Sequence, residues 1–211
     1  MSRAKLVVML KVPQAGRVKT RLGRDIGMTN AAWWFRHQVN ALLRRIEDPR
    51  WQLVLAVAPD RAGLMFRGWP AHLARIPQGT GDLGDRMGRL MRGLPPGPVC
   101  IIGGDIPGVT RAHVAQAFDA LGNHDAVFGP APDGGYWLVG LKRSGRVPSS
   151  LFRDVRWSSE YVSFFERFWP CSRKSLAETF VQRRMILLLR PGCGSWPLQR
   201  CKSRLAGRLI E

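Results

Sequence analysis

The residues best suited to chemistry lie in KVPQAGRVKTRLG, residues 11–23, directly behind the apolar run LVVML. The segment contains neither GxxxxGK[ST] nor GxGxxG, so it is not a phosphate loop of either common type. A turn at Gly16 could still wrap a phosphate with backbone N–H groups, while Lys19 and Arg21 neutralise its charge. The alternative is a solvated basic loop, and this segment alone does not decide between the two.

Three further segments combine glycines with a carboxylate. IIGGDIPG places Asp105 at the end of a predicted strand, where one carboxylate suits Mg²⁺ or Mn²⁺ bound together with substrate phosphates. PQGTGDLGDRM is a glycine-rich turn before a helix with Asp82 as its N-cap, and its backbone can approach a base or ribose closely. PDGGYWLVGL gives Asp133 to a metal or an acceptor, with Gly134 and Gly135 admitting substrate to the backbone.

Each of these segments also has a purely structural interpretation. Asp105 can accept backbone N–H bonds in a turn, the glycine-rich turn can be a loop with a helix cap, and PDGG can be a hairpin turn. Alone, each signal is weak. All four segments follow predicted strands in chain order, however, and together they favour a ligand site.

The elements that must position these residues alternate along the chain. Apolar runs predict strands at KLVVML, WQLVLAVAP, ARIPQG, PVCIIGGD, DAVFGPA and YWLVGL. Helical spacing predicts helices over 29–47 (capped by Thr29 or Asn30), at GDLGDRMGRLMRGL, and after Thr110. This order predicts an α/β fold of three layers, α/β/α, around a mostly parallel sheet. Ligands of such sheets bind beyond the carboxyl ends of the strands, where these segments lie.

Composition narrows the class of protein. The chain has 211 residues, of which 45% are hydrophobic, as expected for a soluble globular domain. We expect a cytoplasmic protein, because the first apolar run is too short for a signal peptide and no run reaches the roughly 18 apolar residues of a membrane span. The four cysteines lack metal-ligand spacing. The net charge of +18 is spread along the chain without a recognised nucleic-acid module, so specific nucleic-acid binding is not expected.

The four motifs together resemble a known bacterial family. KxPxxGxxKTRL, QGxGDLGxRM, IIGGDIPG and DGGYWLVGL are similar to glycosyltransferases of the GT-A (nucleotide-diphospho-sugar transferase) fold that are linked to arsenosugar biosynthesis. That family is related to the molybdopterin and phospholactate guanylyltransferases. The resemblance covers about residues 5–159 and includes VRWSS at 155–159.

The resemblance implies a role for each matching position. Donor nucleotide and phosphates would be bound by Lys11, Gly16, Lys19, Thr20, Arg21, Gln78, Gly79 and Asp82. Asp105 would hold Mg²⁺ or Mn²⁺, and Asp105, Lys19 and Asp133 would form the catalytic set. The acceptor would lie against Gly134, Gly135 and Tyr136. The partners implied are a nucleotide or nucleotide-sugar donor and a small acceptor, without a membrane.

The C-terminal residues after about 160 depart from this family pattern. We therefore divide the chain into a transferase-like domain, 1–160, and an atypical segment, 161–211, with a helix expected near 174–184. The composition changes where the resemblance ends, and we hypothesise that the reading frame was lost near 160–165; the alternative is a divergent tail. Resequencing that finds no continuation of the family pattern in another frame would exclude the frameshift.

Two reactions fit the same residues. In glycosyl transfer, the acceptor attacks the sugar carbon and a nucleoside diphosphate leaves. In nucleotidyl transfer, an acceptor phosphate attacks the α-phosphorus and pyrophosphate leaves. The family resemblance favours glycosyl transfer. A basic nucleic-acid-binding domain and an inactive homologue are the alternatives from other classes.

Overall fold

A computed structural model describes residues 3–131, 136–149, 151–152, 177–181 and 184–189. Within them, eight strands form one sheet in the order β3-β2-β1-β4-β6-β5-β8-β7. The strands are β1 (Ala4–Lys11), β2 (Trp51–Ala58), β3 (Ala74–Pro77), β4 (Val99–Gly103), β5 (Ala126–Pro130), β6 (Tyr136–Leu141), β7 (Ala177–Val181) and β8 (Arg184–Leu189). The helices are α1 (Thr20–Ile26), α2 (Met28–Ile46), α3 (Asp60–Met65), α4 (Leu83–Gly93) and α5 (Arg111–Asn123).

The sheet is mixed, with most strands pointing the same way. β3, β2, β1 and β4 pair in parallel, whereas β6 runs antiparallel between β4 and β5. β8 is antiparallel to β5 and β7 to β8, so only β6 and β8 oppose the direction of the other described strands. The predicted α/β fold with a mostly parallel sheet is therefore confirmed.

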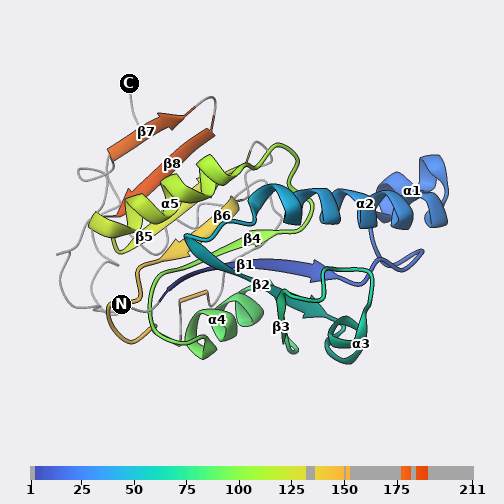
Figure 1. Ribbon diagram of the computed structural model, residues 1–211, viewed down its shortest axis with the longest axis horizontal. Coiled ribbons are helices and arrows are strands. Elements are labelled where there is room, and N and C mark those ends of the chain that lie inside the picture. Colours follow the sequence, from blue (N-terminus) through green and yellow to red (C-terminus); the bar gives the residue numbers. More distant parts are fainter. Residues whose placement is uncertain (1–2, 132–135, 150, 153–176, 182–183, 190–211) are drawn as a thin grey trace, which may run out of the picture.

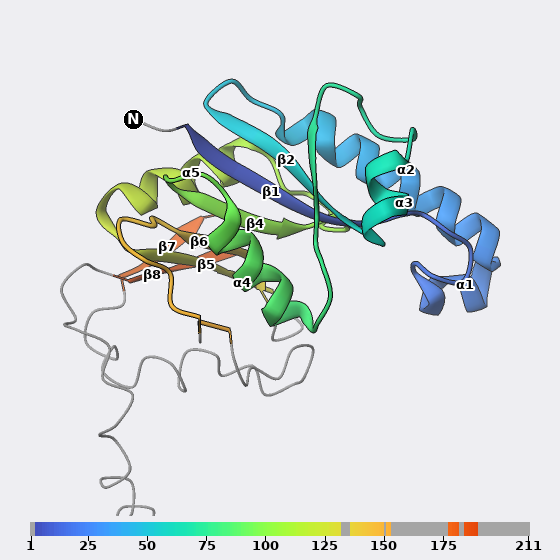
Figure 2. The same ribbon diagram turned by 90° about the horizontal axis from the view of Figure 1, so that it is seen from below.

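Helices cover both faces of the sheet and make it the middle of three layers (Figure 1). Alternate residues of the buried strand β1 point to opposite faces: Leu6, Val8 and Leu10 join the apolar cluster beneath α2 and α5, and Val7 joins the cluster beneath α4. Figure 2 shows α4 on the side of the sheet away from α2 and α5. Strands buried on both faces read as continuous apolar runs, which is why KLVVML was recognisable in the sequence.

Three sequence-based expectations about helices are wrong. Thr29 and Asn30 do not cap the helix over 29–47, because α2 begins one residue earlier with Gly27 at the cap position. The basic segment 11–23 is not loop throughout, as both interpretations of it took it to be, because α1 begins at Thr20. The helix expected near 174–184 is absent from the described part of that range, where 177–181 forms strand β7. Pairing with β8 supplies backbone hydrogen bonds that local helical patterning does not reveal.

Cys100 is a buried free cysteine in the parallel part of the sheet. The thiol is fully buried within β4, and that burial raises its pKa far above the ordinary value. Because a thiol held protonated is a poor nucleophile and metal ligand, Cys100 serves packing, in line with the expectation from cysteine spacing. In the described part of the chain, no helix has the length and apolar character that crossing a membrane requires.

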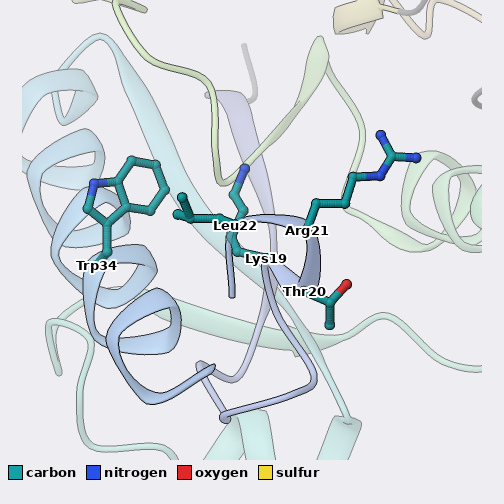
Figure 3. Close-up of a pocket in the computed structure, with 5 residues that line it drawn as sticks. All are labelled: Lys19, Thr20, Arg21, Leu22 and Trp34. Atoms are coloured by element: carbon teal, nitrogen blue, oxygen red, sulfur yellow. The ribbon is translucent and has the colours of Figure 1, made fainter. Parts of the chain in front are cut away.

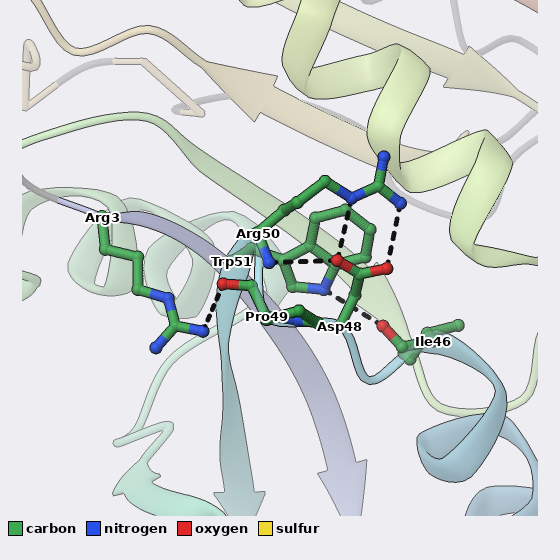
Figure 4. A network of polar contacts seen from close by, with 6 residues as sticks. All are labelled: Arg3, Ile46, Asp48, Pro49, Arg50 and Trp51. Atoms are coloured by element: carbon green, nitrogen blue, oxygen red, sulfur yellow. Dashed lines mark hydrogen bonds and ion pairs between the residues drawn. The ribbon is translucent and has the colours of Figure 1, made fainter.

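The turn between α2 and β2 is tied together at the amino ends of the parallel strands (Figure 4). The Nε and Nη2 atoms of Arg50 donate hydrogen bonds to the Asp48 carboxylate at 2.8 and 3.0 Å. The backbone N–H of Arg50 donates to the same carboxylate at 3.0 Å. The Trp51 indole N–H donates to the carbonyl of Ile46, and the Arg3 guanidinium donates to the carbonyl of Pro49. These bonds fix how the chain leaves α2 and enters the sheet.

This turn gives a pH-dependent prediction. The bonds from Arg50 lower the pKa of Asp48 from 3.8 to about 2. A carboxylate whose pKa is lower in the folded state stabilises the fold above its unfolded pKa, and the effect is lost as pH falls toward 2. We therefore expect Asp48→Asn to lose less stability than the native chain between pH 4 and pH 2. Urea unfolding across this range measures the difference, and parallel curves for the two proteins would contradict it.

Candidate functional site

The parallel strands end together at one edge of the sheet. Lys11, the last residue of β1, lies opposite Ala58 of β2. Gly103, the last residue of β4, lies opposite Met9 of β1. The basic segment leaves this edge after β1, and the IIGGDIPG segment leaves it after β4. β1 and β4 are neighbours in the sheet, so the two segments start side by side, as the sequence predicts.

Lys19 and Asp105 meet at this edge. The Lys19 ammonium lies 2.7 Å from Oδ2 of Asp105, with the two side chains 28% and 48% exposed. A Cβ at Gly104, the residue before Asp105, would collide with the Leu10 side chain, so the backbone there packs closely against the end of β1. Two residues 86 positions apart in the sequence thus form one charged pair that solvent and ligand can reach.

The backbone aims Lys19 at this position. Lys19 adopts the left-handed conformation, with φ 47° and ψ 44°, at the N-cap of α1. A non-glycine residue costs about 1–3 kcal/mol in such a conformation, and such strain collects at functional sites. Gly16 is also left-handed, with φ 74°, and the space around it is open, so its backbone conformation alone accounts for a glycine there. Lys11 is exposed at the end of β1.

Beside the charged pair lies an open hollow of about 410 Å³. Its lining residues come from the start of α1 and from α2: Lys19, Thr20, Arg21, Leu22 and Trp34 (Figure 3). The Lys19 ammonium stands 5.8 Å from the centre of the Trp34 ring. Figure 3 shows Leu22 extending toward that ring and Arg21 extending away from it. The hollow therefore combines cations with one large apolar surface.

The glycine-rich turn after β3 is held from several sides. The Gln78 side chain is 4% exposed, and its amide nitrogen donates to the carbonyls of Leu10 and Ala56, clamping β1 and β2. Arg89 donates to the carbonyls of Gln78 and Thr80 at 2.6 and 3.0 Å. These bonds make residues 78–80 a fixed backbone surface at the same edge of the sheet.

The other two predicted residues of this turn also make bonds within the protein. Gly79 donates its N–H to the Asp60 carboxylate at 3.0 Å. Asp82 caps α4: its carboxylate accepts from the Asp85 N–H at 2.8 Å, and Asp85 returns a bond to the Asp82 N–H. The predicted N-cap is thus confirmed.

The predicted acceptor residues fall partly outside the described structure. Asp133, Gly134 and Gly135 lie beyond the described residues. Tyr136 begins β6 at the same edge and pairs with Pro130, and its ring centre lies 5.4 Å from that of Phe128, with the two ring planes tilted by 56°. Burial raises the pKa of Tyr136 to about 12, so its hydroxyl is protonated at neutral pH.

The possible metal ligands at this edge of the sheet would bind a metal ion only together with a substrate. Among the described residues, no group of three or more His, Cys, Asp or Glu side chains could hold a metal ion. Asp105 offers one half-exposed carboxylate, next to the cation Lys19. Mg²⁺ commonly binds through one or two carboxylates plus substrate phosphates and water. The described residues at this edge therefore fit Mg²⁺ or Mn²⁺ bound with a diphosphate, and by themselves do not form a cage of protein ligands around a metal.

Sequence reasoning missed Trp34. Phe35, Val39 and Leu42 form the buried stripe of α2, whereas Trp33 and Trp34 are 63% and 38% exposed. The sequence signal for this residue was a pair of adjacent tryptophans outside the apolar stripe of the helix, because tryptophan side chains are normally highly buried. Only the fold shows that one of them faces the basic segment.

Known proteins resemble this chain in sequence and in fold. A family model described as "Uncharacterized protein conserved in bacteria (DUF2064)" matches residues 41–159. The crystal structure of a "putative nucleotide-diphospho-sugar transferase" from Desulfovibrio desulfuricans G20 is 30% identical, with a TM-score of 0.70 over 80% of this chain and 76% of that one. The two chains share one fold. No curated protein matches the sequence.

A more distant likeness is to 4-diphosphocytidyl-2C-methyl-D-erythritol synthase from Anaerococcus prevotii DSM 20548. It is 9% identical, with a TM-score of 0.48 over 79% of this chain and 84% of that one. A likeness at this level says nothing about activity.

Proposed function

The chain belongs to the bacterial family DUF2064 and has a nucleotide-diphospho-sugar transferase fold, and we propose that it is a metal-dependent glycosyltransferase. It would move a sugar from a nucleoside-diphosphate sugar to a small acceptor. The observation that carries the proposal is the exposed pair of Lys19 and Asp105, formed where β1 and β4 end. The cytoplasmic location and the arsenosugar link expected from the sequence remain part of this proposal.

Lys19 and Arg21 would bind the diphosphate of the donor. Their cationic groups flank the hollow at the sheet edge, and charge-assisted bonds to phosphate oxygens are among the stronger hydrogen bonds in proteins. As the acceptor oxygen bonds to the sugar carbon and the bond to the phosphate oxygen breaks, negative charge grows on the departing nucleoside diphosphate. Fixed cations at that place stabilise the transition state.

Asp105 would hold Mg²⁺ or Mn²⁺ against the same diphosphate. When bound, the metal supplies further positive charge to the leaving group. In the free protein the Lys19 ammonium pairs with the Asp105 carboxylate at 2.7 Å, which holds both side chains at the site. The bound diphosphate would then share Lys19 with Asp105.

The remaining predicted residues would frame the two ends of the reaction. The fixed turn 78–82 would face the nucleoside, through backbone more than side chains, since the Gln78 and Asp82 side chains already make internal bonds. Tyr136, with Asp133, Gly134 and Gly135, would face the acceptor.

A thermal-shift panel tests the function. We expect UDP- or GDP-sugars with Mn²⁺ to raise the Tm, because a ligand bound only by the folded state stabilises it by mass action. Free nucleoside triphosphates and salt-sensitive binding of RNA serve as the comparison arms. Stabilisation by a triphosphate alone would instead indicate nucleotidyl transfer, and metal-independent RNA binding would indicate a nucleic-acid-binding domain.

A further inference from the structure

The exposed indole of Trp34 has no role in the function proposed so far. It is 38% exposed, lines the hollow with Leu22, and stands 5.8 Å from the Lys19 ammonium. Burying an exposed tryptophan face in contact with a ligand would remove apolar surface from water, which is favourable. Trp34 therefore offers a flat apolar surface within reach of a group whose phosphate sits on Lys19.

The layers of the fold separate Trp34 from the turn assigned to the nucleoside. Trp34 belongs to α2, which covers one face of the sheet, whereas residues 78–82 lead into α4 on the opposite face. Lys19 lies at the edge of the sheet, paired with Asp105 at the end of β4. A donor with its nucleoside on the α4 side and its diphosphate on Lys19 would direct its other end toward α2.

Connectivity favours a sugar ring at Trp34. The sugar of such a donor is joined to the outer phosphorus through a single oxygen, whereas the base is separated from the inner phosphorus by a methylene group and the ribose. The short distance from Lys19 to the indole suits the group attached directly to the phosphate. A hexose presents C–H groups on its faces and hydroxyls at its rim, and the hollow matches the faces with an apolar wall of Trp34 and Leu22.

We propose that Trp34 is the platform on which the transferred hexose of the donor stacks, with Leu22 beside it. This inference rests on the proposed function, because it takes the diphosphate to be on Lys19. It makes Trp34 a specificity residue for the sugar and not for the nucleotide.

The test compares each nucleotide with and without its sugar. Affinities of UDP-glucose and UDP, GDP-mannose and GDP, and dTDP-glucose and dTDP are measured by calorimetry with Mn²⁺ for the native chain, Trp34→Ala, Trp34→Phe and Trp33→Ala. Trp33 is the matched control, since it adjoins Trp34 but contacts the His37 ring, with ring centres 4.1 Å apart, and does not line the hollow.

We expect Trp34→Ala to weaken the preferred nucleotide-hexose about tenfold, the effect of losing roughly 50 Å² of apolar contact. Binding of the matching free diphosphate should not change. Trp34→Phe should restore part of the loss, and Trp33→Ala should bind both ligands like the native chain. Unchanged Tm values would show that the variants fold.

Three results would overturn the inference. Equal weakening of hexose and free diphosphate would place the base or ribose on Trp34. If the native chain binds a nucleotide-hexose and Trp34→Ala binds it equally well, Trp34 does not contact the sugar. The proposed function would not be affected by that result. Failure of the native chain to bind any nucleotide-hexose would reject the proposed function and this inference together.

Discussion

Asp105→Asn is expected to lower kcat/KM for glycosyl transfer by about 10²–10³-fold, the scale of removing one group that stabilises transition-state charge. The amide keeps the size of the carboxylate but loses the charge that would hold the metal. Stability should hardly change, because the Asp105–Lys19 pair is exposed and such pairs contribute about 0–1 kcal/mol. Steady-state kinetics with the preferred donor and Mn²⁺, together with a Tm, measure both effects.

The control for this variant is Asp119→Asn, which removes an exposed carboxylate on α5 away from the sheet edge. It should keep native activity. If Asp105→Asn retained native kcat/KM and the same dependence on Mn²⁺, the carboxylate would have no part in the reaction and the proposed site would be misplaced.

Lys19→Met should weaken donor binding about 10–100-fold, because a hydrogen bond from a charged donor contributes about 1.5–3 kcal/mol. Free nucleoside diphosphate should lose as much affinity as the nucleotide-sugar, since Lys19 is assigned to the phosphates shared by both ligands. This equal loss separates Lys19 from Trp34, whose replacement should affect only the sugar. Calorimetric titration of both ligands measures the two losses.

Lys142→Met is the matched control for Lys19→Met, since Lys142 bonds the Gly122 carbonyl and does not line the hollow. Lys19→Arg should retain part of the affinity because it keeps the charge. The double variant Lys19→Met/Asp105→Asn should lose less than the sum of the single losses, since residues in contact are not independent. Full additivity in donor binding would contradict a shared site.

The sequence was most informative where burial sets the pattern. The strands of the parallel region are continuous apolar runs because both faces are covered, so β1, β2 and β4 could be placed from these runs alone. Knowing that such strands end at one edge placed Lys19 and Asp105 on the same side of the sheet, and the structure brings them to 2.7 Å. The Asp82 cap was predictable because capping is a local interaction.

Contacts between distant segments were not predictable. The internal bonds of Gln78 go to carbonyls of β1 and β2, residues far away in the sequence, so the motif alone did not show how that side chain is used. The same holds for Trp34, whose position beside Lys19 depends on how α1 folds back on α2. The strand at 177–181 was missed because a hairpin derives its hydrogen bonds from its partner strand.

The most direct test of the site is a crystal structure with the best-stabilising nucleotide-hexose and Mn²⁺, with the metal located by its anomalous signal. We predict Mn²⁺ within about 2.0–2.3 Å of an Asp105 carboxylate oxygen, a distance typical of small divalent cations. We also predict the donor diphosphate in hydrogen-bonding contact with the Lys19 ammonium. A donor bound away from the ends of β1 and β4, with neither residue in contact, would contradict the account.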